Sequence, residues 1–244
     1  MSPRIKAFTI HIVGSSILAA CAMAWVFLVW YPAPLAQATG VTHIFLLMLC
    51  IDVILGPLFT LLVYKVGKKT LRFDLTTIIV IQLLGFSYGM YAVAEGRPAW
   101  LTFNTTGFVL VRVSDIDTQP QSKVLPEYRH APWFGPKWVA AHMPDNTQQL
   151  NELLFKSAST GIDPAVYNNL YTPLLLETTA IQKAHKPLSR LQDHNLPENI
   201  KAALAKYPNA NSWLPLWSQV HSTVVLLDKN NNVLSIVDLN PWKQ

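Results

Sequence analysis

The sequence of 244 residues has little cysteine, and its two cysteines, Cys21 and Cys50, both lie within long apolar runs. Neither belongs to a CxxC pair or to a Cys/His cluster with metal-ligand spacing, which argues against disulfides, dithiol redox chemistry and a structural zinc site. Residues 95–244 contain no cysteine at all. A domain of roughly 150 residues is large enough to be held by an ordinary apolar core.

The sequence also lacks the short motifs of common enzymes. It has no GxSxG motif, no phosphate-binding loop and no HExxH pattern. His185, Ser189 and Asp193 are close along the chain, but only within a polar, helix-ending stretch. We therefore expect no enzymatic activity, no metal site and no cofactor.

Charge is scarce in the first third of the chain, where three apolar runs dominate: Phe8–Trp30, Val41–Val63 and Leu75–Ala94. Each run has roughly 20 residues, the length at which an α-helix crosses a hydrocarbon core of about 30 Å. The sequence thus predicts a membrane domain over residues 1–96, with transmembrane helices at about 8–30, 41–63 and 75–94.

The few charges of this region predict its topology. The loop over residues 31–40 carries none, whereas basic side chains precede the first run and separate the second from the third. These basic residues are Arg4, Lys6, Lys65, Lys68, Lys69 and Arg72. Short basic loops stay in the cytoplasm, beside anionic lipid headgroups. We expect the N-terminus inside the cell and everything after Ala94 outside, in the periplasm of a Gram-negative cell.

The net charge of +5 does not indicate nucleic-acid binding. Residues 1–94 carry six basic and two acidic side chains, whereas residues 95–244 carry thirteen and twelve. The excess is therefore a topology signal, and the outer part has no basic patch suited to phosphates.

The second apolar run contains the residue that lipid penalises most. Asp52 lies near its middle, where a carboxylate costs about 2.5–3.5 kcal/mol on insertion scales. Gly56, Pro57 and Thr60 follow it, and Pro57 leaves a carbonyl one turn back without its usual donor. Asp52, Gly56 and Thr60 recur every fourth residue, so we expect one polar stripe on this helix.

Two interpretations of this stripe stay open. In the structural one, a protonated Asp52 hydrogen-bonds Gln82 or Ser87 of the third span, and the proline only shapes the bundle. In the functional one, the stripe is a docking point for a polar group on another transmembrane segment. Proton or ion transport is disfavoured, because three helices make a poor pathway and no second acid is available.

Other residues of the membrane region have expected structural roles. Asp74 is placed to cap the third helix, and Gly67 to end the second. Trp25, Trp30 and Tyr31 are expected to form an aromatic belt at the outer membrane–water interface. Small surfaces for helix contact are expected at Gly56, Gly85 and Gly89.

Residues 97–244 combine strand and helix patterns. Strands are predicted over residues 100–113 and in a closing hairpin over residues 222–238. Residues 114–146 are expected to be mostly loop. Helices are predicted after a cap at Asp145 or Asn146, after Asp163-Pro164, after Thr172-Pro173 and over Pro197–Lys206. This pattern describes an α+β extracytoplasmic domain that follows the three transmembrane helices.

Several short motifs, in this order and spacing, resemble one family. They are Asp52-x3-Gly56-Pro57-x2-Thr60, Gly67-Lys68-Lys69-x-Leu71-x-Phe73-Asp74-Leu75, Gln82 with Tyr88-Gly89-x-Tyr91, Arg97-Pro98-Ala99-Trp100, Ala184-x-Lys186-Pro187-Leu188, Trp213-Leu214-Pro215-Leu216 and Pro241-Trp242. Together they resemble the TfpX/TfpZ type IV pilin accessory proteins, a group that includes FimB-like proteins. The resemblance covers nearly the whole chain, but residues 123–146 match none of its motifs.

The resemblance implies an accessory factor of the bacterial inner membrane that assists or modulates type IV pilin assembly or stability by binding pilin. A pilin waits in that membrane as one apolar helix with a periplasmic head, so both halves of this chain can meet it. Type IV pilin, the pilus assembly machinery and membrane lipids are the expected partners. Our hypothesis for the partner-binding residues is Asp52, Gly56, Pro57, Thr60, Gln82 and Tyr88.

The alternative is a membrane-tethered periplasmic sensor or ligand-binding protein without catalytic activity. It is disfavoured because the predicted inner loop has only ten residues, Lys65–Asp74, and so no room for an effector domain.

Overall fold

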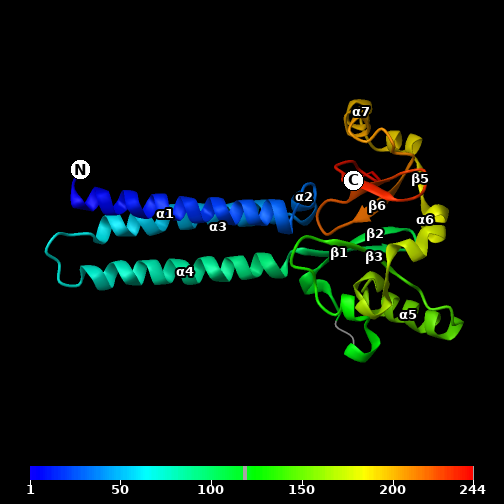
Figure 1. Ribbon diagram of the computed structural model, residues 1–244, viewed down its shortest axis with the longest axis horizontal. Helices are drawn as coiled ribbons and strands as arrows, with labels where there is room; N and C mark the ends of the chain where they lie inside the picture. The colour runs from blue at the N-terminus through cyan, green and yellow to red at the C-terminus, as the bar shows by residue number, and fades with distance from the viewer. Residues whose placement is uncertain (118–119, 244) are drawn as a thin grey trace.

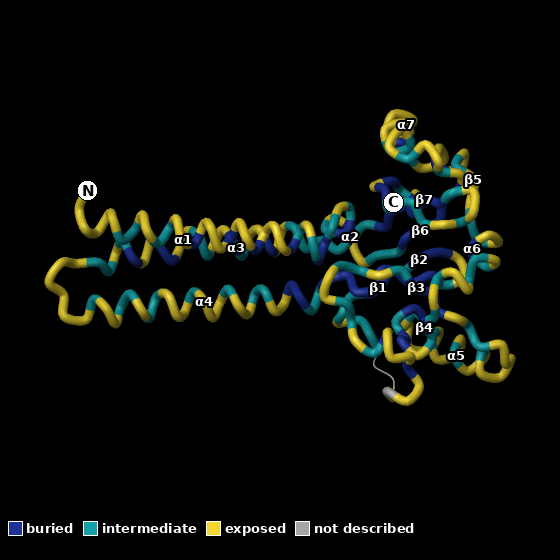
Figure 2. The backbone as a smooth tube through the Cα atoms, viewed as in Figure 1, coloured by how far each residue is buried: buried dark blue, intermediate teal, exposed yellow. Residues whose placement is uncertain are grey.

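A computed structural model describes residues 1–117 and 120–243 of the chain. The molecule is elongated, with three long helices at one end and a mixed sheet with short helices at the other (Figure 1). Most residues exposed in Figure 2 along the long helices are apolar, whereas the central strands of the sheet are largely buried. The predicted fold class, three transmembrane helices followed by an α+β domain, is confirmed.

The three long helices follow the three apolar runs. Helix α1 (Pro3–Trp25) continues into a π-helical turn (Val26–Trp30), α3 covers Val41–Val63, and α4 covers Leu71–Glu95. Each is long and apolar enough to cross a membrane. The bounds of α3 match the prediction, whereas α1 and α4 begin about one turn earlier than expected.

Both predicted caps in the loop between α3 and α4 are wrong. Helix α3 ends at Val63, before Gly67, which lies in the following turn with a φ of +81°. Thr70 takes the cap position of α4, and Asp74 lies in its first turn. The Asp74 carboxylate accepts a hydrogen bond from Thr70 Oγ1 at 3.0 Å and pairs with Lys68 Nζ at 2.8 Å. Asp74 therefore still stabilises this helix start, as an acid beside the helix dipole.

Helix α3 packs along both α1 and α4. Two of the three predicted glycine contacts are confirmed, because a Cβ at Gly56 would collide with Gln82 and one at Gly89 with Met48. The prediction for Gly85 is wrong: a Cβ there would have no neighbour within 4 Å. Gly85 leaves an open position on α4.

An eight-stranded sheet has the order β4-β3-β1-β2-β6-β7-β8, with β5 also paired to β6. The strands are β1 (Pro98–Asn104), β2 (Gly107–Arg112), β3 (Lys137–Ala141), β4 (Tyr171–Thr172), β5 (Lys186–Pro187), β6 (Ser212–Trp217), β7 (Thr223–Leu227) and β8 (Val233–Val237). Both predicted hairpins, β1–β2 and β7–β8, form as antiparallel pairs. The prediction of a loop over residues 114–146 missed strand β3, which pairs with β1 in parallel.

The helices of this part lie mainly where the sequence predicts them. They are α5 (Thr147–Thr160), α6 (Thr178–Ala184) and α7 (Pro197–Ala205). Short 3₁₀ turns cover Val113–Asp115, Gln121–Lys123, Pro126–Tyr128, Pro164–Val166, Asn168–Leu170, Leu174–Glu177 and Leu188–Asp193. The Asn146 side chain caps α5 by accepting from the backbone N–H groups of Gln148 and Gln149.

The connection between α1 and α3 forms part of the sheet core. Its short helix α2 (Leu35–Thr39) buries Leu35 and Ala38 among core residues that include Leu101 and Phe108. The Ala38 carbonyl accepts from the backbone N–H groups of Val220 and His221, each at 3.3 Å. The division into residues 1–96 and 97–244 stays a prediction, and α2 is the segment that crosses it.

A second junction forms where the sheet-side ends of α1 and α4 meet the sheet. The Trp30 indole donates to the Trp133 carbonyl at 3.1 Å, and the Tyr31 hydroxyl donates to the Val93 carbonyl at 2.8 Å. Trp30 and Tyr31 are thus buried, so their predicted place in a lipid-facing belt is wrong, and only Trp25 stays exposed. Burial raises the pKa of the Tyr31 hydroxyl above its ordinary value.

The packing of α2 leads to a stability prediction. We expect Leu35→Ala to lower the free energy of unfolding by about 2–5 kcal/mol, because it opens a cavity in the sheet core. Leu175→Ala, at a side chain that is 77% exposed, is the matched control. Denaturant unfolding of the detergent-solubilised protein, followed by tryptophan fluorescence, measures both. Equal stability of the two variants would mean that α2 does not belong to the core.

Candidate functional site

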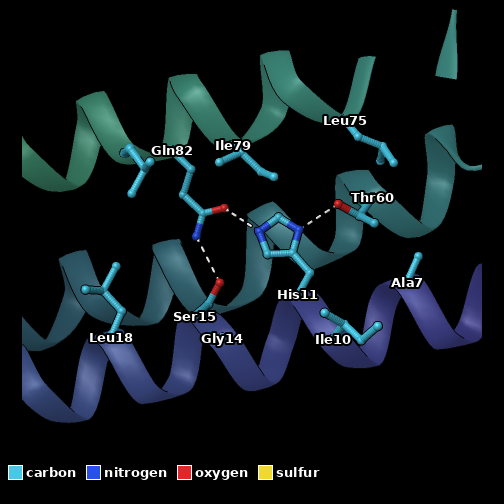
Figure 3. Close-up of a pocket in the computed structure, with 11 residues that line it drawn as sticks. Ala7, Ile10, His11, Gly14, Ser15, Leu18, Thr60, Leu75, Ile79 and Gln82 are labelled. Atoms are coloured by element: carbon cyan, nitrogen blue, oxygen red, sulfur yellow. Dashed lines mark hydrogen bonds between the residues drawn. The ribbon is translucent and has the colours of Figure 1, made fainter. Parts of the chain in front are cut away.

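Polar side chains from all three long helices meet inside the bundle. The His11 ring of α1 lies between two partners, with Nδ1 at 2.7 Å from Thr60 Oγ1 of α3 and Nε2 at 2.9 Å from Gln82 Oε1 of α4 (Figure 3). Ser15, one turn along α1, accepts from Gln82 Nε2 at 3.1 Å. We call His11, Ser15, Thr60 and Gln82 the His11 cluster.

The hydrogen bonds of Gln82 fix the roles of all four side chains. Its amide nitrogen also donates to the backbone carbonyl of Asp52 at 3.0 Å, and a carbonyl can only accept. The amide oxygen therefore faces His11, so His11 Nε2 carries a proton and donates. In the neutral ring, Nδ1 then accepts from the Thr60 hydroxyl. Each polar side chain of the cluster thus has a partner, as helices in lipid require.

Gly56 makes this arrangement possible. A Cβ at Gly56 would collide with the end of the Gln82 side chain, so only glycine lets the amide reach across α3. Pro57 is buried beside it, and α3 continues through Pro57 to Val63. The Gly-Pro pair therefore shapes the contact between α3 and α4.

Two grooves flank Gln82. One, of about 430 Å³, lies between α1 and α4, and the His11 cluster and apolar side chains line it (Figure 3). The other, of about 290 Å³, lies between α3 and α4. Apolar side chains line it together with Asp52, Gly56, Gln82 and Gly85. Gln82 lines both grooves and separates them.

Asp52 does not pair as the structural interpretation predicted. Gln82 bonds its backbone carbonyl and not its carboxyl group. Asp52 Oδ2 is buried and has no hydrogen-bond partner within residues 1–117 and 120–243. The predicted alternative bond from Asp52 to Ser87 is therefore also not formed by this oxygen. An unpaired polar atom in an apolar setting costs free energy that a matching donor would recover.

The remaining predicted site residues fall into two groups. Thr60 and Gln82 belong to the His11 cluster, and Gly56 and Pro57 support it. Tyr88 takes no part in the cluster and is 75% exposed. It follows Ile81 and Gly85 at helical spacing, so it continues the α4 side of the groove that contains Asp52. Lys65, Lys68, Lys69 and Arg72 are exposed at the bundle end far from the sheet (Figure 1).

Sequence reasoning missed His11, which belongs to none of the motifs or candidate sites named above. The available signal was an ionisable side chain inside an apolar run, with Ser15 four residues later on the same helix face. An ionisable residue within a membrane span is by default a candidate site residue.

The part of the chain outside the bundle brings together no catalytic constellation of the kind considered from sequence. His185 Nδ1 lies 3.0 Å from Asn231 Oδ1, and no hydrogen bond joins it to Ser189 or Asp193 among the described residues. Within residues 1–117 and 120–243, no three His, Cys, Asp or Glu side chains are grouped so that they could hold a metal ion.

The fold and the bundle define a class, a membrane-anchored protein with three apolar helices and an α+β domain. The family profile described as Fimbrial assembly protein FimB matches residues 1–40. A serogroup I fimbrial assembly protein of Dichelobacter nodosus is 32% identical over 243 residues, covering 96% of this chain and 94% of the relative. The chain therefore belongs to the fimbrial assembly protein family.

Further relatives agree with this membership. The serogroup E1 fimbrial assembly protein of Dichelobacter nodosus is 31% identical over the same 96% of this chain. The protein of serogroups C1 and C2 is 36% identical over 117 residues, which is 46% of this chain and 89% of the relative. No solved structure matches the chain. The resemblance to FimB-like proteins seen in the motifs is thus confirmed.

Gly56 and Gly85 allow a matched test of the bundle. We expect Gly56→Ala to lower the free energy of unfolding by about 1–3 kcal/mol, because the new methyl group displaces Gln82 and breaks its bonds to His11 and Ser15. Gly85→Ala makes the same chemical change where space is free, and its stability should stay near that of the parent. Unfolding in mixed micelles measures both, and a larger effect at Gly85 would contradict the described packing.

Proposed function

We propose that this protein acts in fimbrial biogenesis as a non-catalytic accessory factor of the bacterial inner membrane, and that it binds a type IV pilin. Family membership supports the role in fimbrial assembly, since the relatives are named for it. The observation that carries the binding proposal is the buried Asp52 Oδ2, which has no hydrogen-bond partner among the described residues and belongs to a side chain that lines a groove in the membrane bundle.

The groove between α3 and α4 suits an apolar helix. Its lining is apolar apart from Asp52 and the edge of Gln82. Without a hydrophobic force between helices in lipid, association depends on close packing and on hydrogen bonds between helices. Gly85 offers the close approach, because no side chain fills the space above it. Asp52 offers the hydrogen bond, and a pilin helix supplies the apolar face.

The polar groups of the groove between α1 and α4 make it a less favourable docking site for a pilin helix. His11, Ser15, Thr60 and Gln82 already satisfy one another, so a partner that bonded them would have to break a bond first. Their role in the proposal is to hold α1, α3 and α4 together. Tyr88 extends the docking face toward the sheet, where a pilin head would stand.

The charges support a periplasmic sheet domain. Arg4 donates to the Leu61 carbonyl, so the basic N-terminus and the basic loop lie together at one end of the bundle. That end lies away from the sheet (Figure 1). Basic segments of this kind stay on the cytoplasmic side and contact anionic lipids.

A labelling experiment tests this topology. In a variant with Cys21 and Cys50 replaced by Ala, we expect Asn230→Cys to react with a membrane-impermeant maleimide in spheroplasts. Lys68→Cys should react only after the membrane is permeabilised. Both sites lie in exposed turns, so access to the reagent, and not burial, decides the result. Reaction of Lys68→Cys in intact spheroplasts would overturn the proposed orientation.

A crosslinking experiment tests the docking face. With a photoreactive residue at Leu55, we expect crosslinks to the pilin helix, and far fewer from a control probe at Ile10 in the other groove. Asp52→Asn should weaken capture, and Asp52→Leu should weaken it more. One intramembrane hydrogen bond is worth about 0.6–2 kcal/mol, which corresponds to a loss of several-fold to tens-fold in affinity.

The yields are normalised to protein abundance, because a purely structural Asp52 would lower abundance and capture in parallel. Equal normalised yields for the parent, Asp52→Asn and Asp52→Leu would reject Asp52 as the docking residue. Stronger crosslinks from Ile10 than from Leu55 would place the pilin in the groove between α1 and α4.

A further inference from the structure

The loop over residues 131–136, which we call the aromatic loop, presents two large apolar side chains outside the core. Phe134 is 78% exposed and Trp133 is 59% exposed. The loop lies within residues 123–146, which match none of the motifs of the family. Large apolar side chains that gather on a surface usually mark an interaction site. The exposure of Trp133 and Phe134 therefore needs an explanation other than packing in the core.

The aromatic loop is held against the outer end of α1. The Trp133 carbonyl accepts from the Trp30 indole at 3.1 Å, and the Phe134 and Trp25 rings meet edge-on at 6.2 Å. Gly135 has a φ of +71°, and a Cβ there would lie 3.2 Å from the Val29 carbonyl oxygen. Glycine therefore allows the loop backbone to run directly along the helix.

The contact with Trp25 sets the depth of Phe134. The first span covers 28 residues, Pro3–Trp30. At ~1.5 Å per residue that is about 42 Å, close to the thickness of a bilayer with its headgroup regions. Trp30 then lies in the headgroup region, and Trp25 about 7.5 Å deeper. The Phe134 ring meets the Trp25 ring at 6.2 Å and so lies near that depth, although it belongs to the sheet domain.

We propose that the aromatic loop inserts Trp133 and Phe134 into the lipid interface on the side of the sheet domain. The occupant of this surface is lipid, because the loop continues the lipid-facing wall of α1, where Leu28 and Trp25 are themselves exposed. Aromatic side chains are favoured at that depth. Lys137, exposed directly after the loop, is placed to meet lipid phosphates.

The loop thus gives the domain a second contact with the bilayer, in addition to its covalent link through α4. This inference rests on the three membrane-spanning helices and is independent of pilin binding. It holds whether or not Asp52 is a docking residue.

Depth measurements by spin labelling test it on the full chain, in bilayers of phosphatidylethanolamine and phosphatidylglycerol. A nitroxide is attached at Phe134→Cys in the variant with Cys21 and Cys50 replaced by Ala. Leu47→Cys, on the lipid face of α3, is the lipid reference. Phe155→Cys, 76% exposed on α5 and far from the helices (Figure 1), is the water reference.

We expect the label at position 134 to collide readily with oxygen and to lose its collisions with a water-soluble nickel complex, as at position 47. Position 155 should show the reverse. Nickel collisions at 134 equal to those at 155 would overturn the inference. So would shielding from both reagents, since that result would indicate a protein cover.

A second measurement guards against misfolding of the labelled chain. Trp133→Phe keeps an aromatic ring, so the fold should be retained. We expect brominated lipids to quench the remaining tryptophan fluorescence by a smaller fraction than in the parent. An unchanged or larger quenched fraction would show that Trp133 does not reach the lipid.

Discussion

The joint between the helices and the sheet depends on one buried cation. The Arg97 guanidinium lies 4.5 Å from the Trp133 ring centroid and 5.8 Å from that of Trp30. Its Nη1 donates to the Ala94 carbonyl at 2.6 Å, and its Nη2 to the Pro132 carbonyl at 3.4 Å. A single side chain thus connects the end of α1, the end of α4 and the aromatic loop.

The physical setting explains why an arginine can be buried there. Burial lowers the pKa of Arg97 below its ordinary value, but guanidinium stays protonated in proteins. The C-terminal carbonyls of α4 carry a partial negative charge, which favours a cation at that end. Two indole faces replace part of the lost hydration. A lysine would keep the charge but lose the planar stacking and the two divergent donors.

The bundle separates satisfied from unsatisfied polar groups. Gln82 uses both ends of its amide to satisfy His11, Ser15 and a backbone carbonyl, so the centre of the bundle is closed to further hydrogen bonding. Asp52 lies on the other side of Gln82, where it lines the groove between α3 and α4, and its buried Oδ2 has no hydrogen-bond partner among the described residues. The face with Asp52 therefore suits a partner, whereas the face with the His11 cluster holds the three helices together.

The sequence predicted what depends on local pattern. Residues 41–63 form a long, mostly apolar run after Gly40, and α3 has those bounds. The β7–β8 hairpin follows from two apolar strands around a polar turn. Strand β3 was missed because its place depends on the distant β1, with which it pairs in parallel within a proline-rich segment. The burial of Trp30 and Leu35 was missed for the same reason, since a long-range contact leaves no periodicity to read.

The candidate site shows the same limit. A polar stripe through Asp52, Gly56 and Thr60 was predictable from helical spacing, but its partners were not. Whether Gln82 would meet the carboxyl group or the backbone of Asp52 depends on how closely α4 approaches Gly56. His11 entered the site because α1 packs against α3, and nothing in the local sequence of either helix specifies that register.

The end of each long helix that faces the sheet is fixed to it by a different contact. Trp30 attaches α1, the buried helix α2 attaches α3, and Arg97 attaches α4 at the start of β1. At the other end, the loop that joins α3 to α4 is exposed, and Arg4 donates to the Leu61 carbonyl. The groove that contains Asp52 is therefore held at a set distance from the sheet. A partner with one membrane helix and a head outside the membrane, as proposed for pilin, would therefore hold its head at a set distance from the sheet once its helix lay in the groove, which would raise the effective concentration of the head there.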